Sequence, residues 1–238
     1  MKLNIQKTKN IIFNYSKNFQ FSTDLKLEGD FIETVSETKL LGTIITNDLN
    51  WSKNTQSVVK QSNRRMSFLH KASKFTSNSN DLKKIYMLQV RSKLEQSAVL
   101  WHSSLSKKNR NDLERVQKSA LRVILGNKYT SYSDALKLLN IDSLEDRRKK
   151  LCLKFAKSCL KVDKLRKMFP KSSTMHGMSK RNLEFYKVNR TLTERYLNSA
   201  IPQMQRLLNS YQKKKIETLS QLNMPVNFDL SKSLSLRN

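Results

Sequence analysis

The chain has 238 residues, of which 46 are lysine or arginine and 19 are aspartate or glutamate, so its formal net charge is +27 at pH 7. This length can hold one or two domains with a hydrophobic core. The few glycines and prolines, four and three, favour long helices over a turn-rich β-sandwich. Because we find no signal peptide and no long apolar run, we expect no membrane span and an intracellular protein, in the cytoplasm or the nucleus.

The positive charge is distributed unevenly along the chain. Residues 1–50 contain six lysines and six acidic residues, whereas residues 51–238 contain 40 basic and 13 acidic residues. Such an excess of positive charge either binds a polyanion or destabilises the folded protein by self-repulsion. A phosphate backbone would be such a polyanion, and its binding would depend on salt. The alternative is a lysine-rich surface that only keeps the protein soluble. An anionic membrane is disfavoured, because the charge is spread over many predicted helices.

The cysteines and histidines do not predict a metal site. Cys152 and Cys159 are two helical turns apart, which favours small core residues in a reducing compartment over a disulfide. The three histidines, His70, His102 and His176, have no ligand spacing with each other or with the cysteines.

Residues 1–50 have the patterns of short strands. Residues 25–27 and 31–35 alternate in hydropathy, and the turn residues 28–30 join them as a hairpin. Residues 11–13 form a short apolar run, and residues 39–46 are predicted to form one further strand. Because no helix in this segment could cover them, we expect the partial sheet to resemble the edge of a larger one, with little protection from hydrogen exchange.

Downstream of Trp51 the hydrophobic period becomes helical. We predict helices over residues 51–75, 81–101 and 107–125, and two more that begin at Ser131 and Ser143, the second ending near residue 160. Asp134 and Asp146 follow these serines at the spacing of a capping box. The positions predicted to face the core are Val58, Met66, Leu69, Leu82, Tyr86, Val90, Leu94, Ser97, Trp101, Leu113, Val116, Ala120 and Ile124.

The last third of the chain is less regular. Residues 163–190 lose the periodicity, which predicts a basic loop or a partly disordered arm. Residues 191–212 are helical, with an interruption or kink at Pro202, and residues 213–238 are predicted to fray. The predicted fold class is therefore α+β, with a small partial β-sheet at 1–50, a mainly α-helical domain at 51–162, the loop or arm at 163–190 and a helical segment with a tail at 191–238.

An ordered set of motifs runs along the chain. It begins with Asn4-Ile5-Gln6-Lys7-Thr8 and continues with Leu40-Leu41-Gly42 and Leu49-Asn50-Trp51; further blocks span residues 86–101, 113–122, 132–148 and 193–202. In this order, over about residues 1–209, they resemble the C-terminal part of a non-LTR (LINE-type, jockey-like) retrotransposon reverse transcriptase. The resemblance implies the end of the palm, a primer-grip hairpin, a thumb and a C-terminal extension.

Enzymes of this family copy RNA into DNA with two metal ions held by paired aspartates. The chain contains no Asp-Asp dipeptide, so we assign no catalytic residue and expect no polymerase activity from this chain alone; Mg²⁺ is expected only in a complete polymerase. Lys7 matches the family lysine near the incoming nucleotide, or it is an ordinary lysine flanking a strand. Leu41 and Gly42 match the turn that supports the primer end, or the glycine simply marks a bulge.

The thumb-like segment is expected to hold RNA, DNA or an RNA–DNA hybrid through the sugar–phosphate backbone. The candidate nucleic-acid contacts are Lys60, Arg64, Arg65, Arg91, Lys93, Arg115, Lys118 and Arg122. The basic run 147–150 opens a predicted helix, where the alternative is a solvated cap region paired with Glu145 and Asp146. Four aromatic residues are predicted to lie in the core and not to stack on bases: Trp51, Tyr86, Trp101 and Phe155.

Three functions remain open. The first is a fragment of a retrotransposon RNA-directed DNA polymerase that lacks the catalytic aspartates and binds nucleic acid non-specifically. The second is a repurposed basic helical nucleic-acid-binding protein with a cellular role. The third is a thumb subunit that acts in trans with a fingers–palm polypeptide, which could pair with an exposed sheet edge.

Overall fold

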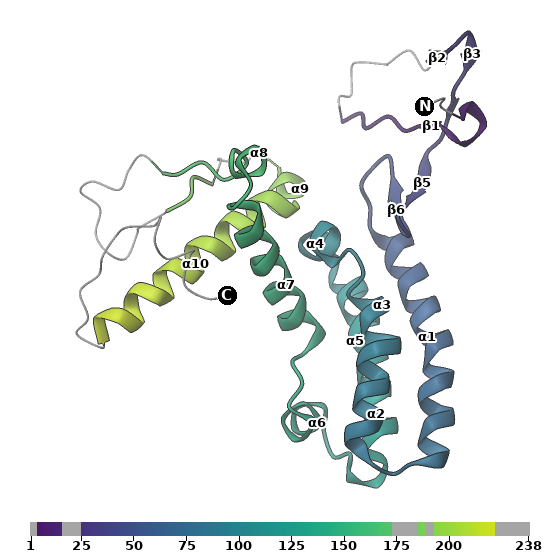
Figure 1. The fold of residues 1–238 in the computed structure, drawn as a ribbon, viewed down its shortest axis with the longest axis vertical. Coiled ribbons are helices and arrows are strands. Elements are labelled where there is room, and N and C mark those ends of the chain that lie inside the picture. Colours follow the sequence, from purple (N-terminus) through teal and green to yellow (C-terminus); the bar gives the residue numbers. More distant parts are fainter. Residues whose placement is uncertain (1–3, 16–24, 173–184, 189–192, 222–238) are drawn as a thin grey trace. The chain divides into compact units, whose positions relative to one another are not determined.

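The computed structural model describes residues 4–15, 25–172, 185–188 and 193–221 (Figure 1). The fold is α+β, as predicted: it is mostly helical, with small two-stranded sheets near the N-terminus. The chain divides into two compact units, Met1–Lys150 and Leu151–Asn238. The division falls inside helix α7 (Leu144–Cys159), whereas the predicted helical domain ends at residue 162. Within the described ranges, no helix has both the length and the apolar character needed to cross a bilayer.

The strands of the first unit form separate ladders and not one partial sheet. After the short 3-10 helix η1 (Ile5–Lys7), β1 (Lys9–Asn10) pairs in parallel with β4 (Glu33–Thr34), and β2 (Lys26–Leu27) pairs antiparallel with β3 (Asp30–Phe31). The predicted turn at 28–30 is confirmed, because Glu28 and Gly29 join β2 to β3 with positive φ angles. The prediction of a strand at 11–13 is wrong, since the ladder ends at Asn10.

Residues 39–46 form a hairpin, so the prediction of a single strand is wrong. β5 (Glu37–Leu40) pairs antiparallel with β6 (Thr43–Thr46). The turn residues Leu41 and Gly42 have φ angles of +47° and +83°, and two consecutive positive φ values give the turn twist that two-residue hairpins favour. The continuous apolar sequence hides this turn, because Leu41 rarely adopts such a conformation.

The β5–β6 hairpin is covered by the helical part of the first unit. The Ile44 N–H donates to Asn54 Oδ1 of α1 (Ser52–Phe75) at 3.1 Å, and Thr43 and Thr46 are buried. The Gln96 side-chain amide donates to the Leu41 carbonyl at 3.2 Å. The expectation of strands without a covering helix is therefore wrong for β5 and β6.

Helices α1 and α5 (Lys107–Leu125) pack against each other and supply much of the core. The predicted core residues of both helices are buried: Val58, Met66 and Leu69 on α1, and Leu113, Val116, Ala120 and Ile124 on α5. The predicted start and end of α5 are confirmed. It ends where Gly126 adopts a positive φ of 50°, and the short η4 (Gly126–Lys128) follows.

Residues 81–101 do not form one helix, which corrects the prediction. The structure has α2 (Ser79–Ile85), the π-helical η2 (Tyr86–Arg91), α3 (Ser92–Leu94) and α4 (Ala98–Trp101). A π-helical stretch changes the register of the buried face, and the helix breaks at Ser97, whose φ is +53°. Ala98 is consequently buried in place of the predicted Ser97, while Leu82, Tyr86, Val90, Leu94 and Trp101 are buried as predicted.

A buried polar network connects the helices of the first unit. Gln117 of α5 is fully buried; its Nε2 donates to Tyr132 Oη and to the Asp142 carbonyl, both at 3.0 Å, and its Oε1 accepts from Tyr86 Oη at 2.6 Å. Tyr132, the first residue of α6 (Tyr132–Leu139), donates to Glu114. Burial raises the pKa of both tyrosines well above the usual value, so they remain protonated donors.

The predicted capping serines are confirmed. Ser131 Oγ accepts from the Asp134 N–H at 3.1 Å and donates to the Asp134 carboxylate at 2.6 Å. Ser143 and Asp146 make the same pair of contacts before α7, at 3.1 and 2.7 Å. These contacts satisfy backbone donors that a helix start leaves unpaired.

The second unit contains the end of α7, α8 (Asp163–Arg166), α9 (Glu194–Leu197) and α10 (Ala200–Gln221). The described part of 163–190 includes α8 and a bridge between Lys171 and Tyr186, and Phe169 and Tyr186 are buried. These segments are short and are held by tertiary contacts, so their sequence shows no hydrophobic period. Predictions for 173–184, 189–192 and 222–238 lie outside the described residues.

The helical stretch predicted at 191–212 is interrupted at residues 198–199, between α9 and α10, and not at Pro202. Helix α10 also ends later than predicted. Pro202 lies in its first turn, where the missing N–H would have no intrahelical partner, so it does not interrupt the helix. The helix continues to Gln221, beyond residue 212.

Candidate nucleic-acid interface

A groove of about 710 Å³ runs between α1 and α5, which lie side by side (Figure 1). Three of the predicted contact residues, Lys60, Arg64 and Arg115, line it together. The other lining residues are Thr55, Gln56, Val59, Asn63, Asp112, Val116 and Ser119. The groove therefore combines cations, neutral hydrogen-bonding groups and two valines.

The sequence of α1 explains why one of its faces is cationic. The helix has 24 residues, six of them lysine or arginine and none of them acidic. Lys60 and Arg64 are four positions apart, so their side chains lie one turn apart on the same face. Both are exposed. No acid on α1 can neutralise this stripe.

Two further predicted contacts on α5, Lys118 and Arg122, do not line the groove. Arg122 follows Arg115 by seven positions, so it lies two turns further along the same face of α5. Two tyrosines hold these cations. Lys118 Nζ lies 5.0 Å from the centroid of the Tyr132 ring, and Arg122 Cζ lies 5.3 Å from that of Tyr129. A cation over an aromatic face is attracted by the ring quadrupole, which restricts a long side chain.

One acid works against the groove cations. Asp112 Oδ1 lies 3.5 Å from Arg115 Nη1, one helical turn away on α5. The pair is largely on the surface, so it adds little stability. It does lower the local positive potential that a phosphate would meet.

The remaining three predicted contacts lie elsewhere. Arg91 is only 9% exposed, and its Nε donates to Glu95 Oε1 at 2.8 Å, so it is not available for a phosphate contact at the surface. Lys93 is buried and donates to Gln96; burial lowers its pKa, and the charges of Arg65 and Lys39 add to the effect. Arg65, half-buried, donates through Nη1 to the Gln89 carbonyl at 3.0 Å.

Of the residues predicted to belong to a palm and a primer grip, Lys7 and Leu41 are exposed and Gly42 is half-buried. Lys7 is exposed at the end of η1, shortly before β1. Leu41 is 90% exposed at the tip of the β5–β6 hairpin. At Gly42 an added Cβ would lie 2.5 Å from Gln96 Nε2, so the glycine there accommodates a side chain and not a backbone.

Three residues of the basic run 147–150 pair with acids of the protein. The alternative of a solvated cap region is correct only in part, because Glu145 pairs with Lys149 while Asp146 contacts Ser143 and Arg148 is fully buried. Arg147 pairs with Glu95 at 3.2 Å, Lys149 with Glu145 at 2.8 Å and Lys150 with Asp142 at 2.6 Å. The hydrogen bond from Lys149 holds the pKa of Glu145 below its usual range.

Arg148 is the residue that the sequence analysis missed. It is fully buried, its Nε donates to His102 Nδ1 at 3.2 Å, and its Cζ lies 5.9 Å from the centroid of the Trp101 ring. Its Nη1 and Nη2 have no hydrogen-bond partner among the described residues. Burial, followed by the charge of Arg148, lowers the pKa of His102, on η3 (His102–Ser104), to about 4. Burial also lowers the pKa of Arg148 itself. Its spacing of four from Leu144 and Cys152, both buried, was the available signal.

The aromatic and cysteine predictions hold with one exception. Tyr86 and Trp101 are buried and Trp51 packs against the core, but Phe155 is 44% exposed, so its core assignment is wrong. Cys152 and Cys159 are buried and are not joined by a disulfide. In the described part of the chain, no group of three histidine, cysteine or acidic residues could hold a metal ion.

Comparisons of the chain with protein-family models, with curated proteins and with solved structures find no match.

Proposed function

We propose that the helical part of residues 51–150 binds the sugar–phosphate backbone of a nucleic-acid duplex or RNA–DNA hybrid without reading its sequence. The observation that carries the proposal is the α1–α5 groove, in which Lys60, Arg64 and Arg115 meet from two helices. A backbone carries closely spaced phosphates, so a row of cations on rigid helices can neutralise several of them at once.

The chemistry of the groove supports backbone contacts over base recognition. Gln56, Asn63 and Ser119 add exposed neutral side chains beside the cations, whereas Thr55 is buried and donates to the Trp51 carbonyl. Arginine, lysine and such side chains supply most protein contacts to phosphate and sugar oxygens. Lys118 and Arg122 would extend the same contact surface along α5 by a further two turns.

We further propose that the chain is part of a retroelement-type polymerase, as its motifs imply, and that it does not polymerise alone. In that setting the β5–β6 hairpin, with Leu41 and Gly42 at its turn, would approach the primer, and Lys7 would lie near the nucleotide site. The catalytic carboxylates and their Mg²⁺ would come from a fingers–palm segment.

The test is the salt dependence of binding, measured by fluorescence anisotropy with labelled DNA duplexes and RNA–DNA hybrids of unrelated sequence. The variant Lys60→Gln/Arg64→Gln/Arg115→Gln should bind all of them more weakly. If each side chain neutralises one phosphate, the slope of log K against log salt should flatten by about 3.

The matched control is Lys128→Gln/Lys137→Gln/Lys164→Gln, which removes the same charge from exposed lysines outside the groove. It should change the slope much less. Equal losses in both triple variants would mean that net charge and not the groove causes binding, and would refute the proposal.

Replacing Asp112 should change the binding affinity in the opposite direction. Asp112→Asn removes the carboxylate beside Arg115, so binding should become tighter at low salt. Asp134→Asn is a poor control because the Asp134 carboxylate accepts from Ser131, the N-cap of α6. Asp81→Asn removes an acid from the surface pair with Lys84 and should have little effect. Unchanged affinity for Asp112→Asn would argue against phosphate in the groove.

Two alternatives have distinct outcomes in the same experiments. Strong preference for one sequence, with weak salt dependence, would favour a repurposed regulator. A thumb subunit acting in trans is supported by the exposed apolar residues of the strands and turns, among them Phe31 and Leu41. It would require binding to a fingers–palm polypeptide that restores primer extension.

A further inference from the structure

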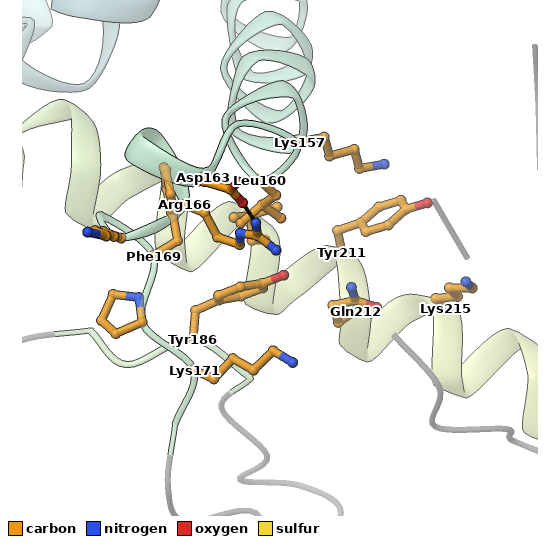
Figure 2. Close-up of a pocket in the computed structure, with 13 residues that line it drawn as sticks. Lys157, Leu160, Asp163, Arg166, Phe169, Lys171, Tyr186, Tyr211, Gln212 and Lys215 are labelled. Carbon is orange, nitrogen blue, oxygen red and sulfur yellow. Dashed lines mark ion pairs between the residues drawn. The ribbon is translucent and has the colours of Figure 1, made fainter. Parts of the chain in front are cut away.

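The second unit contains a pocket of about 630 Å³ that no sequence motif pointed to (Figure 2). It is built by α7, α8, α10 and the two extended segments next to the Lys171–Tyr186 bridge. Its lining residues are Lys157, Leu160, Asp163, Arg166, Lys167, Phe169, Pro170, Lys171, Tyr186, Leu208, Tyr211, Gln212 and Lys215.

Hydrogen bonds fix the walls of the pocket. Asn209 of α10 accepts from the Tyr186 N–H and donates to the Tyr186 carbonyl, both at 2.9 Å. Gln205 donates to the Met168 carbonyl at 2.9 Å. Between the two segments, the Ser172 N–H donates to the Phe185 carbonyl at 3.0 Å and the Lys187 N–H to the Pro170 carbonyl at 2.9 Å. The pocket is therefore a built feature of the unit.

The pocket combines an apolar, aromatic floor with a cationic rim. Phe169, Tyr186 and Leu208 are buried beneath it. Five basic residues line it against one acid, Asp163, which pairs with Arg166. In Figure 2 the ends of Arg166 and Tyr186 point into the same space between α8 and α10.

Tyr211 offers an accessible ring at the edge of the pocket. It is 38% exposed, and Lys157 Nζ lies 3.2 Å from the centroid of its ring. The ammonium covers one face of the ring, so a flat base can stack on the other face, with the positive charge of Lys157 near the phosphate of that base.

We propose that this pocket binds one nucleotide unit, that is, a base stacked on its tyrosines with the attached phosphate on Arg166, Lys171 and Lys215. The ligand is either a nucleotide within a single strand or a free nucleotide. The volume is within the usual range of small-ligand pockets. An acidic peptide would use the cations but leave the aromatic floor unmatched, so the nucleotide is favoured. The site shares no residue with the α1–α5 groove.

The test uses the full chain carrying the groove substitutions Lys60→Gln/Arg64→Gln/Arg115→Gln, which reduces binding outside the pocket. The probe is fluorescein-labelled tetrathymidylate, measured by anisotropy. Lys171→Gln/Lys215→Gln should weaken its binding about 10-fold or more, because two of the proposed phosphate contacts are lost. The matched control Lys187→Gln/Lys214→Gln removes two exposed neighbouring lysines outside the pocket lining and should have little effect.

Stacking is tested separately with Tyr211→Leu and its control Tyr196→Leu, an exposed tyrosine on α9. Loss of one stacked base should weaken binding at least about fivefold in the first variant only. Circular dichroism checks that both variants keep the helical content of the parent.

Competition with unlabelled ligands distinguishes the possible sources. AMP that competes as well as tetrathymidylate identifies a free-nucleotide site, and AMP that competes poorly identifies a single-strand site; both outcomes support the proposal. Equal weakening by pocket and control variants, equal competition by tetraglutamate, or no binding of either nucleotide ligand would overturn it. Duplex binding by the groove should survive the pocket variants, so the two proposals fail independently.

Discussion

Replacing Gly42 with alanine tests whether the β5–β6 hairpin is locked to the helical part of the first unit. Two costs add at this position. Alanine at a φ of +83° costs about 1–2 kcal/mol relative to glycine. The new Cβ would also lie 2.5 Å from Gln96 Nε2 and displace the amide that donates to the Leu41 carbonyl. Loss of that hydrogen bond adds about 1 kcal/mol.

The two costs can be separated by a double-mutant cycle with Gln96→Ala. Gly42→Ala should lower the local opening free energy of β5–β6 by about 2–3 kcal/mol in the parent chain. In the Gln96→Ala background only the φ cost should remain, at about 1–2 kcal/mol. The coupling between the two sites is then about 1 kcal/mol.

The assay is native-state hydrogen exchange of the β5–β6 amides, read residue by residue by NMR. Gly29→Ala is the matched control, measured on β2–β3, because its φ of +96° is also positive while nothing lies within 4 Å of the added Cβ. Equal losses at Gly42 with and without Gln96 would refute the contact, and with it the view that the helices cover this hairpin.

Four further predictions concern buried side chains and primer extension. Because the pKa of His102 is depressed, its contribution to stability is complete above about pH 6.5 and is lost as the pH falls toward about 4. The free energy of unfolding in urea should therefore decrease by up to about 3 kcal/mol over this range, and by less in His102→Gln. In Arg148→Met the His102 pKa, followed by NMR, should rise, and the free energy of unfolding should fall by less than about 1 kcal/mol, because a poorly paired buried cation is removed. Tyr86→Phe leaves Gln117 Oε1 without its donor and should cost about 1–3 kcal/mol in urea unfolding, whereas the exposed Tyr196→Phe should cost almost nothing. The chain alone should not extend a primer on an RNA template with Mg²⁺ or Mn²⁺, and incorporation above background would contradict the fragment hypothesis.

Local patterns alone predicted helices α1 and α5 and the starts of α6 and α7. The 3.6-residue period over 51–75 and 107–125, the capping serines Ser131 and Ser143 and the glycine after Leu125 all act within a few residues of where they stand. The absence of acids from α1 was also visible, and with it the cationic face. These features depend on short-range hydrogen bonds and on the spacing of side chains along one helix.

Tertiary contacts decided which cations stay at the surface. They also decided which segments without a hydrophobic period adopt a defined structure. Arg64 and Arg91 have the same chemistry, yet one lines the groove and the other is buried, where its Nε pairs with Glu95. The turn at Leu41 and Gly42 depends on Gln96, and the pocket of the second unit depends on Asn209 and Gln205. Each of these contacts joins residues that are far apart in the sequence, and no local period records such a pairing.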